Sequence, residues 1–380
     1  MGDATRVTAV EAVPVSVPVE TAYETSLSVS TGTQETYDHV VVRVRTDAGV
    51  VGHGEVAPYA SWPHGLSQRA ALALVEDVLA PLVEGRRLDH VHRIVEDCWG
   101  ALSAEPFPLC GVDVALWDAL GKHRDLPVYD LLGGPAGDEP TVDLHYSIGI
   151  EDPEDVRAAA AAAAEDGLTA FKLKVGGPDF AAERDAVAAI TEAIPDARIR
   201  VDANQGWSVP EAIRRIPRLD EAADGLVLVE QPVDYDDVAG LGRVREAVAP
   251  PILADEACFG PRDVARLARA DACDVVNVKL AKTGGLARAV DVATVADAHG
   301  LPCFVGSMLE LGIGTAANAH FAAACPTVTY PTGVLNVHAA DTLVEERARW
   351  TPDGDTFTLP DAPGLGVTPD EDALAAYRVD

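Results

Sequence analysis

Short apolar stretches alternate with alanine-rich amphipathic stretches from Thr141 onward, and this alternation is the main structural signal in the chain. Seven of the apolar stretches have the length of buried strands, and the stretches between them have the length of helices. The predicted strands span residues 142–148, 170–174, 199–202, 226–230, 252–255, 275–279 and 303–305. Strands that alternate with helices in this way predict a parallel sheet, here closed as a barrel.

An eighth strand should complete the barrel, and two weaker segments compete for it, residues 327–330 and 334–337. The tail beyond Thr342 has a further strand-like patch at residues 356–359. We expect this tail to return to the N-terminal part of the chain.

The first third of the chain predicts an α+β unit. Residues 7–17 are predicted as a strand, and apolar and polar residues alternate late in 39–45 before a tight turn and a second strand at 50–54. That order predicts a β-hairpin. Helical stretches follow at residues 66–82, 90–102 and 112–123.

Two lysines stand out in the predicted strand at 170–174. Lys172 and Lys174 are two residues apart, so their side chains share one face of the strand. If that face is the inside of the barrel, the two charges crowd each other and favour a neutral amine, which is the form that takes up a proton. A surface strand with two solvated lysines is the alternative that this motif alone leaves open.

Three further predicted strands end in acidic residues, at the position where barrels of this kind build their active sites. Asp202, Glu230 and Asp255 follow one another at intervals of about one βα unit. Each acid alone has an ordinary explanation, such as capping a helix. Together, without an arginine near them to neutralise them, they predict an oxygen-only site for a hard cation, Mg²⁺ or alternatively Mn²⁺.

The sixth predicted strand ends at Lys279, which shares the inward phase of Asn277. Strands two and six lie opposite each other in an eight-stranded barrel, so Lys174 and Lys279 should face each other with the metal between them. This geometry suits removal of a proton from one face of a carbon atom and delivery to the other face. A bound cation together with Lys172 should lower the pKa of Lys174. Lys282 is expected to cap a strand or to orient Lys279.

The net charge of the chain limits the classes of molecule that it is expected to bind. Acidic residues outnumber basic ones by 61 to 29, and the net charge of −32 argues against binding to nucleic acid or to an anionic membrane surface. The 6 cysteines include no C-x-x-C pair, which argues against a zinc ribbon or a disulfide framework. No apolar run has the length of a signal peptide or a membrane span. We therefore expect a cytoplasmic protein whose partner is a small molecule.

The order of these motifs resembles that of the enolase superfamily and, within it, of the muconate-lactonizing-enzyme subgroup. The resemblance covers nearly the whole chain. It is carried by residues 115–122, residues 131–134, Lys172-Leu-Lys174, Asp202-Ala-Asn204, Glu230-Gln-Pro232, Asp255-Glu256, and Lys279 with Gly284-Gly285.

The resemblance implies a modified TIM barrel, (β/α)7β, with an α+β capping domain. Residues 1–135 would form the capping domain, residues 136–340 the barrel, and residues 341–380 a segment that returns to the capping domain. The resemblance also implies Mg²⁺-dependent removal of the α-proton of a small carboxylate through an enediolate. We further expect a homo-oligomer, from dimer to octamer.

The same resemblance assigns roles to individual residues. The acid/base pair would be Lys174 and Lys279, and the metal ligands would be Asp202, Glu230 and Asp255. Supporting residues would be Lys172, Asn204 and Glu256. Substrate-binding residues would be Ser307 and Glu310 after the seventh strand, with Ser28, Tyr59 and Trp62 in two loops at residues 23–34 and 57–65.

The sequence departs from two patterns of the family, and these departures limit the range of candidate substrates. No His-Asp pair replaces Lys279, which argues against mandelate-racemase-like chemistry. The Asp-x-Asp that dipeptide epimerases carry at the eighth strand is missing from residues 331–340, which argues against a dipeptide with a free amino group. His145 and Ser147 alternate on the first strand and could reach the cavity, and a core position is the other interpretation of His145.

We therefore expect a racemase or epimerase of an amino-acid derivative, N-substituted or cyclic. Two reactions through the same enediolate are the alternatives: cycloisomerisation of a muconate-like diacid, and dehydration of a β-hydroxy acid such as a hydroxyproline. A non-catalytic binding protein would predict a broken set of motifs, whereas these motifs are intact.

Overall fold

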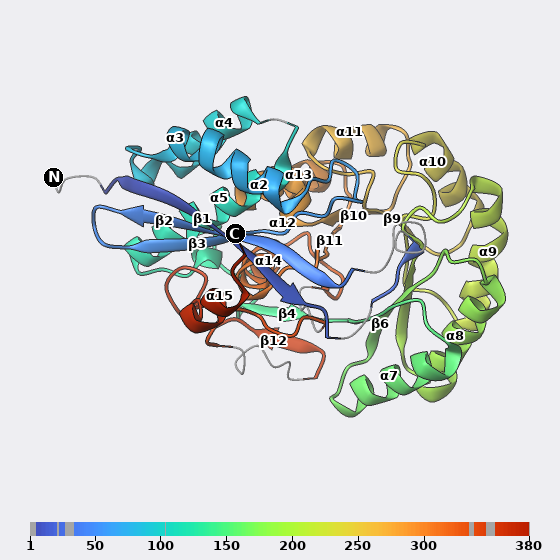
Figure 1. The fold of residues 1–380 in the computed structure, drawn as a ribbon. Coiled ribbons are helices and arrows are strands. Elements are labelled where there is room, and N and C mark those ends of the chain that lie inside the picture. Colours follow the sequence, from blue (N-terminus) through green and yellow to red (C-terminus); the bar gives the residue numbers. More distant parts are fainter. Residues whose placement is uncertain are drawn as a thin grey trace.

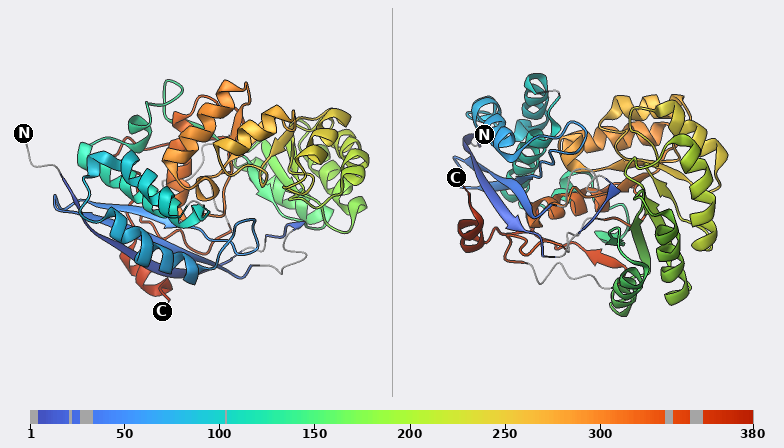
Figure 2. Two further views of the ribbon diagram at one scale, coloured as in Figure 1. Left: turned by 90° about the horizontal axis from the view of Figure 1, so that it is seen from above. Right: turned by 45° about the vertical axis from the view of Figure 1, so that its right-hand side comes forward.

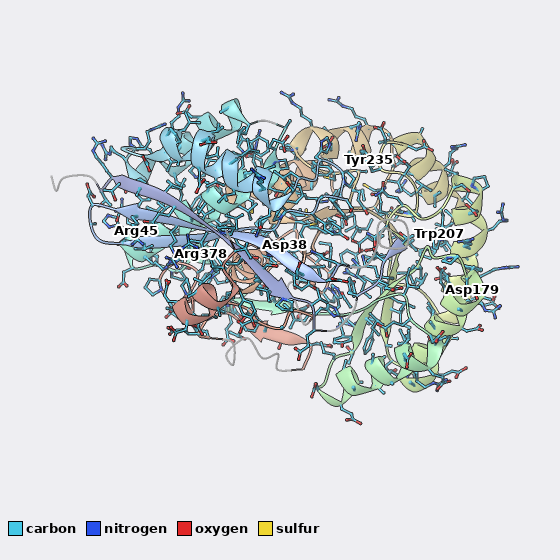
Figure 3. The ribbon with its side chains drawn as sticks, viewed as in Figure 1. Asp38, Arg45, Asp179, Trp207, Tyr235 and Arg378 are labelled. Carbon is cyan, nitrogen blue, oxygen red and sulfur yellow. The ribbon has the colours of Figure 1, made fainter. Side chains whose placement is uncertain are left out.

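The structure is a computed structural model that describes residues 5–20, 23–26, 34–102, 104–333, 338–346 and 354–379 of the chain. Figure 1 shows two parts, an antiparallel sheet with its helices and a curled sheet surrounded by helices. Side chains fill both parts (Figure 3), and one core of buried apolar residues extends through both. No helix within the described ranges is long and apolar enough to cross a membrane.

The N-terminal part contains an antiparallel sheet in the order β1 (Val7–Pro18), β2 (Thr36–Thr46) and β3 (Val51–Val56). The predicted hairpin is confirmed, because β2 and β3 pair directly across the turn. The helices of this part are α2 (Gln68–Leu74), α3 (Ala80–Val83), α4 (Val91–Ala101), α5 (Pro106–Arg124) and α6 (Val128–Leu131). Helix α5 is buried over most of its length because it packs against β3 on one side and against barrel helices on the other.

Helix α5 approaches β3 at glycines. A Cβ atom at Gly54 would lie 1.9 Å from the carbonyl oxygen of Gly111. Gly54→Ala should therefore lower the free energy of unfolding by about 1–3 kcal/mol or more. Gly100→Ala is the matched control: Gly100 lies in α4 with open space around its Cβ position, so alanine should stabilise the helix by about 0.5 kcal/mol. Urea unfolding measures both effects, and a Gly54→Ala protein as stable as the parent would contradict the close packing.

The second part contains a parallel sheet of 7 strands in the order β11 to β5, which confirms the expected barrel-like architecture (Figure 2). Its strands are β5 (Tyr146–Ile148), β6 (Ala170–Lys174), β7 (Arg198–Asp202), β8 (Val229–Glu230), β9 (Ile252–Ala254), β10 (Val275–Val278) and β11 (Cys303–Val305). The helices on its outer side are α7 (Pro153–Glu165), α8 (Phe180–Ala193), α9 (Val209–Ala222), α10 (Val238–Ala247), α11 (Pro261–Arg269) and α13 (Leu286–Ala298). The short α12 (Leu280–Thr283) follows β10, and α14 (Gly312–Ala324) follows β11.

The first predicted strand is divided in the structure. Its beginning, β4 (Thr141–Asp143), pairs with β12 (Thr356–Thr358), whereas β5 joins the barrel. The strand-like patch in the tail therefore forms, but it lies beside the barrel. The return of the tail to the N-terminal part is made by α15 (Glu371–Tyr377), which packs against β1. The domain boundaries at residues 135 and 340 stay predictions.

The gap between β11 and β5 is spanned by an irregular segment, residues 327–333. Cys303 N of β11 donates to Thr327 O at 2.7 Å, and on the other side His145 N donates to Thr332 O at 3.0 Å. The prediction of a regular strand at 327–330 is wrong; Pro326 and Pro331, which lack an amide hydrogen, flank this segment and limit a continuous ladder. The competing segment at 334–337 lies outside the described residues.

Candidate active site

Lys172 and Lys174 lie inside the barrel on β6, and only 6% and 7% of them is exposed. Lys172 Nζ is 2.7 Å from Asp202 Oδ2 and 2.7 Å from Glu230 Oε2. Lys174 Nζ is 2.6 Å from Asp202 Oδ2 and donates to Asn204 Oδ1 at 2.6 Å. The alternative of a solvated surface strand is therefore wrong.

The three predicted acidic positions lie next to one another at the carboxyl ends of adjacent strands. Asp202 ends β7 and is paired in register with Glu230, which ends β8, and Asp255 directly follows β9. All three are fully buried. Because strand residues alternate between faces, the inward positions one step deeper form a floor beneath the acids. Its apolar members form a separate cluster, Leu228, Leu253, Val275 and Phe304.

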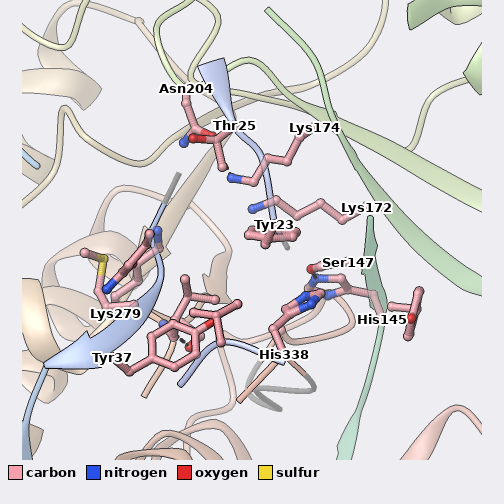
Figure 4. A pocket seen from close by; sticks show the side chains of 18 of the residues that line it. Tyr23, Thr25, Tyr37, His145, Ser147, Lys172, Lys174, Asn204, Lys279 and His338 are labelled. Atoms are coloured by element: carbon pink, nitrogen blue, oxygen red, sulfur yellow. Dashed lines mark hydrogen bonds between the residues drawn. The ribbon is translucent and has the colours of Figure 1, made fainter. Parts of the chain in front are cut away.

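Lys279 follows β10 and faces Lys172 and Lys174 across the pocket (Figure 4). All three lysines line one cavity of about 490 Å³. Lys279 Nζ is 2.7 Å from Asp255 Oδ2 and 4.4 Å from the centre of the Trp62 ring. Lys282 is fully buried and ion-paired with Asp255 Oδ1 at 2.7 Å, so it holds the carboxylate that Lys279 also contacts.

The donor set of the three acids suits a hard cation. Lys172 Nζ already places a positive charge between oxygens of Asp202 and Glu230. Behind them, Glu256 Oε2 is buried without a hydrogen-bond partner among the described residues. In this arrangement the acids point to the lysines, and within the described part of the chain no three His, Cys, Asp or Glu side chains are gathered as a metal cluster. The carboxylate chemistry of Asp202, Glu230 and Asp255 suits Mg²⁺, and their role as its ligands stays a prediction.

Carboxylates around Lys174 and Lys279 raise the pKa of both lysines. Burial alone would lower the pKa of Lys174, but the negative groups around it, Asp202 foremost, together raise it. Burial likewise lowers the pKa of Lys279, and Asp255 together with other nearby acids raises it by more. The crowding of Lys172 and Lys174 therefore does not lower the pKa of Lys174 in this arrangement, where Asp202 lies beside both lysines. The expectation that a bound cation together with Lys172 lowers this pKa stays a prediction.

The family of the chain follows from its two halves. Residues 154–373 match the family "Enolase C-terminal domain-like", and residues 9–133 match "Mandelate racemase / muconate lactonizing enzyme, N-terminal domain". The chain belongs to the enolase superfamily, in its muconate-lactonizing-enzyme subgroup. The expected family and the expected isomerase class are both confirmed.

Individual members of this subgroup are similar to the chain over nearly its full length. It is 34% identical over 361 residues to the L-Ala-D/L-Glu epimerase of Bacillus subtilis (strain 168), with 94% of this chain and 95% of that protein covered. It is 34% identical over 342 residues to muconate cycloisomerase 1 of Rhodococcus opacus, with 89% and 90% covered. The crystal structure of N-succinyl Arg/Lys racemase from Bacillus cereus ATCC 14579 superposes with a TM-score of 0.91 at 26% identity and covers 99% of this chain and 98% of that chain.

The residues expected to contact substrate in this enolase-superfamily enzyme are distributed unevenly. Tyr59, Trp62 and Ser307 line the cavity. Glu310 is buried behind its wall, where it accepts hydrogen bonds from Ser307 Oγ and from Met308 N. Ser28 lies outside the described residues. The substrate-binding roles of these residues stay predictions.

The sequence pattern missed Arg200. It lies on β7 two residues before Asp202, is buried, lines the cavity and stacks on Phe304, with its guanidinium carbon 3.8 Å from the ring centre. The expectation of no neutralising arginine near the acids is therefore wrong. Arg200 could have been predicted to point into the barrel, because it lies two residues before Asp202 and residues two apart on a strand share a face.

Arg200 also helps to keep the ring of His145 neutral. Arg200 Nη2 donates to His145 Nε2 at 3.0 Å, and Ser147 Oγ lies 3.0 Å from the same nitrogen. Burial, together with the charge of Arg200, lowers the pKa of His145 well below its usual value. The neutral ring then donates from Nδ1 to Pro331 O, 3.1 Å away. Both His145 and Ser147 line the cavity, so the core interpretation of His145 is wrong.

Proposed function

We propose that the protein is a Mg²⁺-dependent racemase or epimerase of a small amino-acid derivative with a substituted or cyclic amino group. The observation that carries the proposal is the pair of lysines, Lys174 and Lys279, which enter one cavity from β6 and from the end of β10 on its opposite side. Two opposed amines suit a reaction in which one face of a carbon atom loses a proton and the other gains one.

In the proposed reaction, the neutral amine of one lysine takes the α-proton from the substrate. The C–H bonding electrons then delocalise into the substrate carboxylate as an enediolate. The ammonium group of the other lysine delivers its proton to the opposite face of the same carbon atom. Bound Mg²⁺ supplies positive charge that stabilises the enediolate, as in other enzymes of the superfamily.

The charges around the cavity favour a blocked amino group. Among the described residues, Asp166 is the only acid on the cavity wall, whereas Lys172, Arg200 and the two acid/base lysines bring positive charge to it. Residues 27–33 and 334–337 contain no Asp or Glu. The free ammonium group of a dipeptide would therefore meet one acid and four basic residues at the described wall, which supports an N-substituted substrate over a dipeptide.

Racemisation can be tested in heavy water with Mg²⁺ and a panel of N-acetyl and N-succinyl amino acids, the dipeptide L-Ala-L-Glu, and cis,cis-muconate. We expect an N-acyl amino acid to gain deuterium at its α-carbon and to change configuration, which NMR and chiral chromatography detect. Turnover of the dipeptide alone would contradict the blocked amino group. A lactone formed from muconate would favour cycloisomerisation, the second candidate, which the similarity to muconate cycloisomerase 1 supports. Cytoplasmic location and homo-oligomeric state stay predictions.

A further inference from the structure

Two buried polar residues of the N-terminal sheet take no part in the proton chemistry. His39 lies on β2 and Glu55 on β3, and both are almost completely buried. His39 Nδ1 is 2.7 Å from Glu55 Oε1. A buried carboxylate is costly unless its oxygens are satisfied by hydrogen bonds, so the other partners of Glu55 show what it holds.

Those partners belong to the barrel. Glu55 Oε1 accepts a hydrogen bond from Leu311 N at 2.7 Å, and Glu55 Oε2 accepts one from Gly314 N at 2.8 Å. Both amides lie at the N-terminus of α14, whose own N-cap residue Leu311 provides no side-chain cap. A carboxylate from the N-terminal sheet therefore caps a barrel helix, where its negative charge is also favoured by the helix dipole.

The segment before α14 forms one wall of the cavity. Gly306, Ser307, Met308 and Leu309 all line it. Leu309 has a φ of 62°, a conformation that is unfavourable for a residue with a side chain. The shape of this segment therefore has to be held by its surroundings, and Glu55 bonds to the backbone at its end.

Glu55 is also close along the chain to a second part of the cavity wall. It lies near the end of β3, from which the chain continues into the loop that carries Tyr59 and Trp62. Its partner His39 lines the cavity as well. We propose that Glu55 is a positioning residue that fixes the wall at residues 306–309 relative to the wall at residues 57–65. The distance between these walls sets which substituent fits beside the lysines; only this last consequence rests on the proposed function.

The methionines provide a probe that needs no substrate. The chain has only 2 of them, Met1 and Met308, so protein labelled with methyl-¹³C-methionine gives one signal from the cavity wall, which Met308→Leu assigns. We expect Glu55→Gln and Glu55→Ala to shift and broaden the Met308 signal. Glu11→Gln is the matched control, because Glu11 pairs with Arg45 on β1 and β2 and contacts neither wall. An unchanged Met308 signal in both Glu55 variants would overturn the proposal, even if their melting temperatures fell.

Kinetics provide an independent readout on any substrate that the heavy-water panel yields. Misplaced walls should raise KM about tenfold and leave kcat within about threefold, because the lysines and acids keep their own contacts. Glu55→Gln, which keeps an acceptor oxygen, should be less impaired than Glu55→Ala. Equal loss of kcat in both variants with unchanged KM would contradict a positioning role. The NMR result stands even if no compound in the panel reacts, so failure of the proposed function and failure of this inference are distinguishable.

Discussion

Replacing either lysine of the pair with alanine should abolish racemisation while leaving half of the reaction intact. In Lys174→Ala and Lys279→Ala the turnover between enantiomers should fall by about 10²–10⁴-fold, the usual contribution of a positioned acid or base. Each variant should still exchange the α-proton of one enantiomer with heavy water. The enantiomer that exchanges its α-proton should differ between the two variants, because each variant retains the lysine on a different face of the α-carbon. NMR of each pure enantiomer in heavy water measures this exchange.

The structure makes both variants suitable for this test. Asp202 keeps its ion pair with Lys172 when Lys174 is removed, and Asp255 keeps its ion pair with Lys282 when Lys279 is removed. Neither substitution therefore leaves a buried carboxylate without a cation, which would be strongly destabilising. Circular dichroism should show folded protein in both cases. Exchange of the same enantiomer by both variants, or full racemisation by either, would rule out the two-base mechanism.

Glu230→Gln should weaken Mg²⁺ binding by at least about 10–100-fold. Losses of this size are typical when a residue that only hydrogen-bonds to a metal ligand is replaced, so replacing a ligand should cost at least as much affinity. The substitution keeps the size of the side chain, and the amide oxygen can still accept from Asn277 Nδ2, now 2.9 Å from Glu230 Oε1. It removes the negative charge that a hard cation requires. Isothermal titration calorimetry with Mg²⁺, or Mn²⁺ electron paramagnetic resonance, measures the affinity without any substrate.

Glu211→Gln is the control for this experiment, because Glu211 is a surface residue that hydrogen-bonds to Ser208 at the start of α9. Its affinity for Mg²⁺ should equal that of the parent. A chelator should also abolish turnover by the parent, and added Mg²⁺ should restore it. Equal Mg²⁺ affinity in Glu230→Gln and the parent would remove Glu230 from the metal site, and activity in the presence of chelator would contradict the Mg²⁺ requirement.

The sequence predicted the parts of the site that depend on strand periodicity. Asp202, Glu230 and Asp255 were found because parallel strands of a barrel end at one rim, so acids at the ends of consecutive strands must meet. Lys172 and Lys174 were found because residues two apart share a face. The same rule applied to Arg200 would have placed it beneath Asp202.

Other features depend on contacts between distant segments, which no local pattern encodes. The bond from Glu55 to α14 joins residues more than 250 positions apart, and neither segment alone indicates the other. The raised pKa of Lys174 depends on which carboxylate lies beside it, and its near neighbour Lys172 suggested the opposite shift. The segment at 327–333 closes the sheet through single bridges to two different neighbours. Single bridges do not require the alternating apolar and polar residues by which a regular strand is predicted.

The apolar floor formed by Leu228, Leu253, Val275 and Phe304 has a consequence for how such an enzyme evolves. The acids lie above this floor at the ends of β7, β8 and β9, and the lysines lie on β6 and after β10 of the same sheet, whereas Tyr37, Tyr59 and Trp62 reach the cavity from the N-terminal part. The acids and lysines are thus encoded apart from the part of the cavity wall that the N-terminal stretch of the gene contributes. A few codon changes in the N-terminal stretch can offer the same proton-transfer apparatus a new compound, and selection can act on one without dismantling the other.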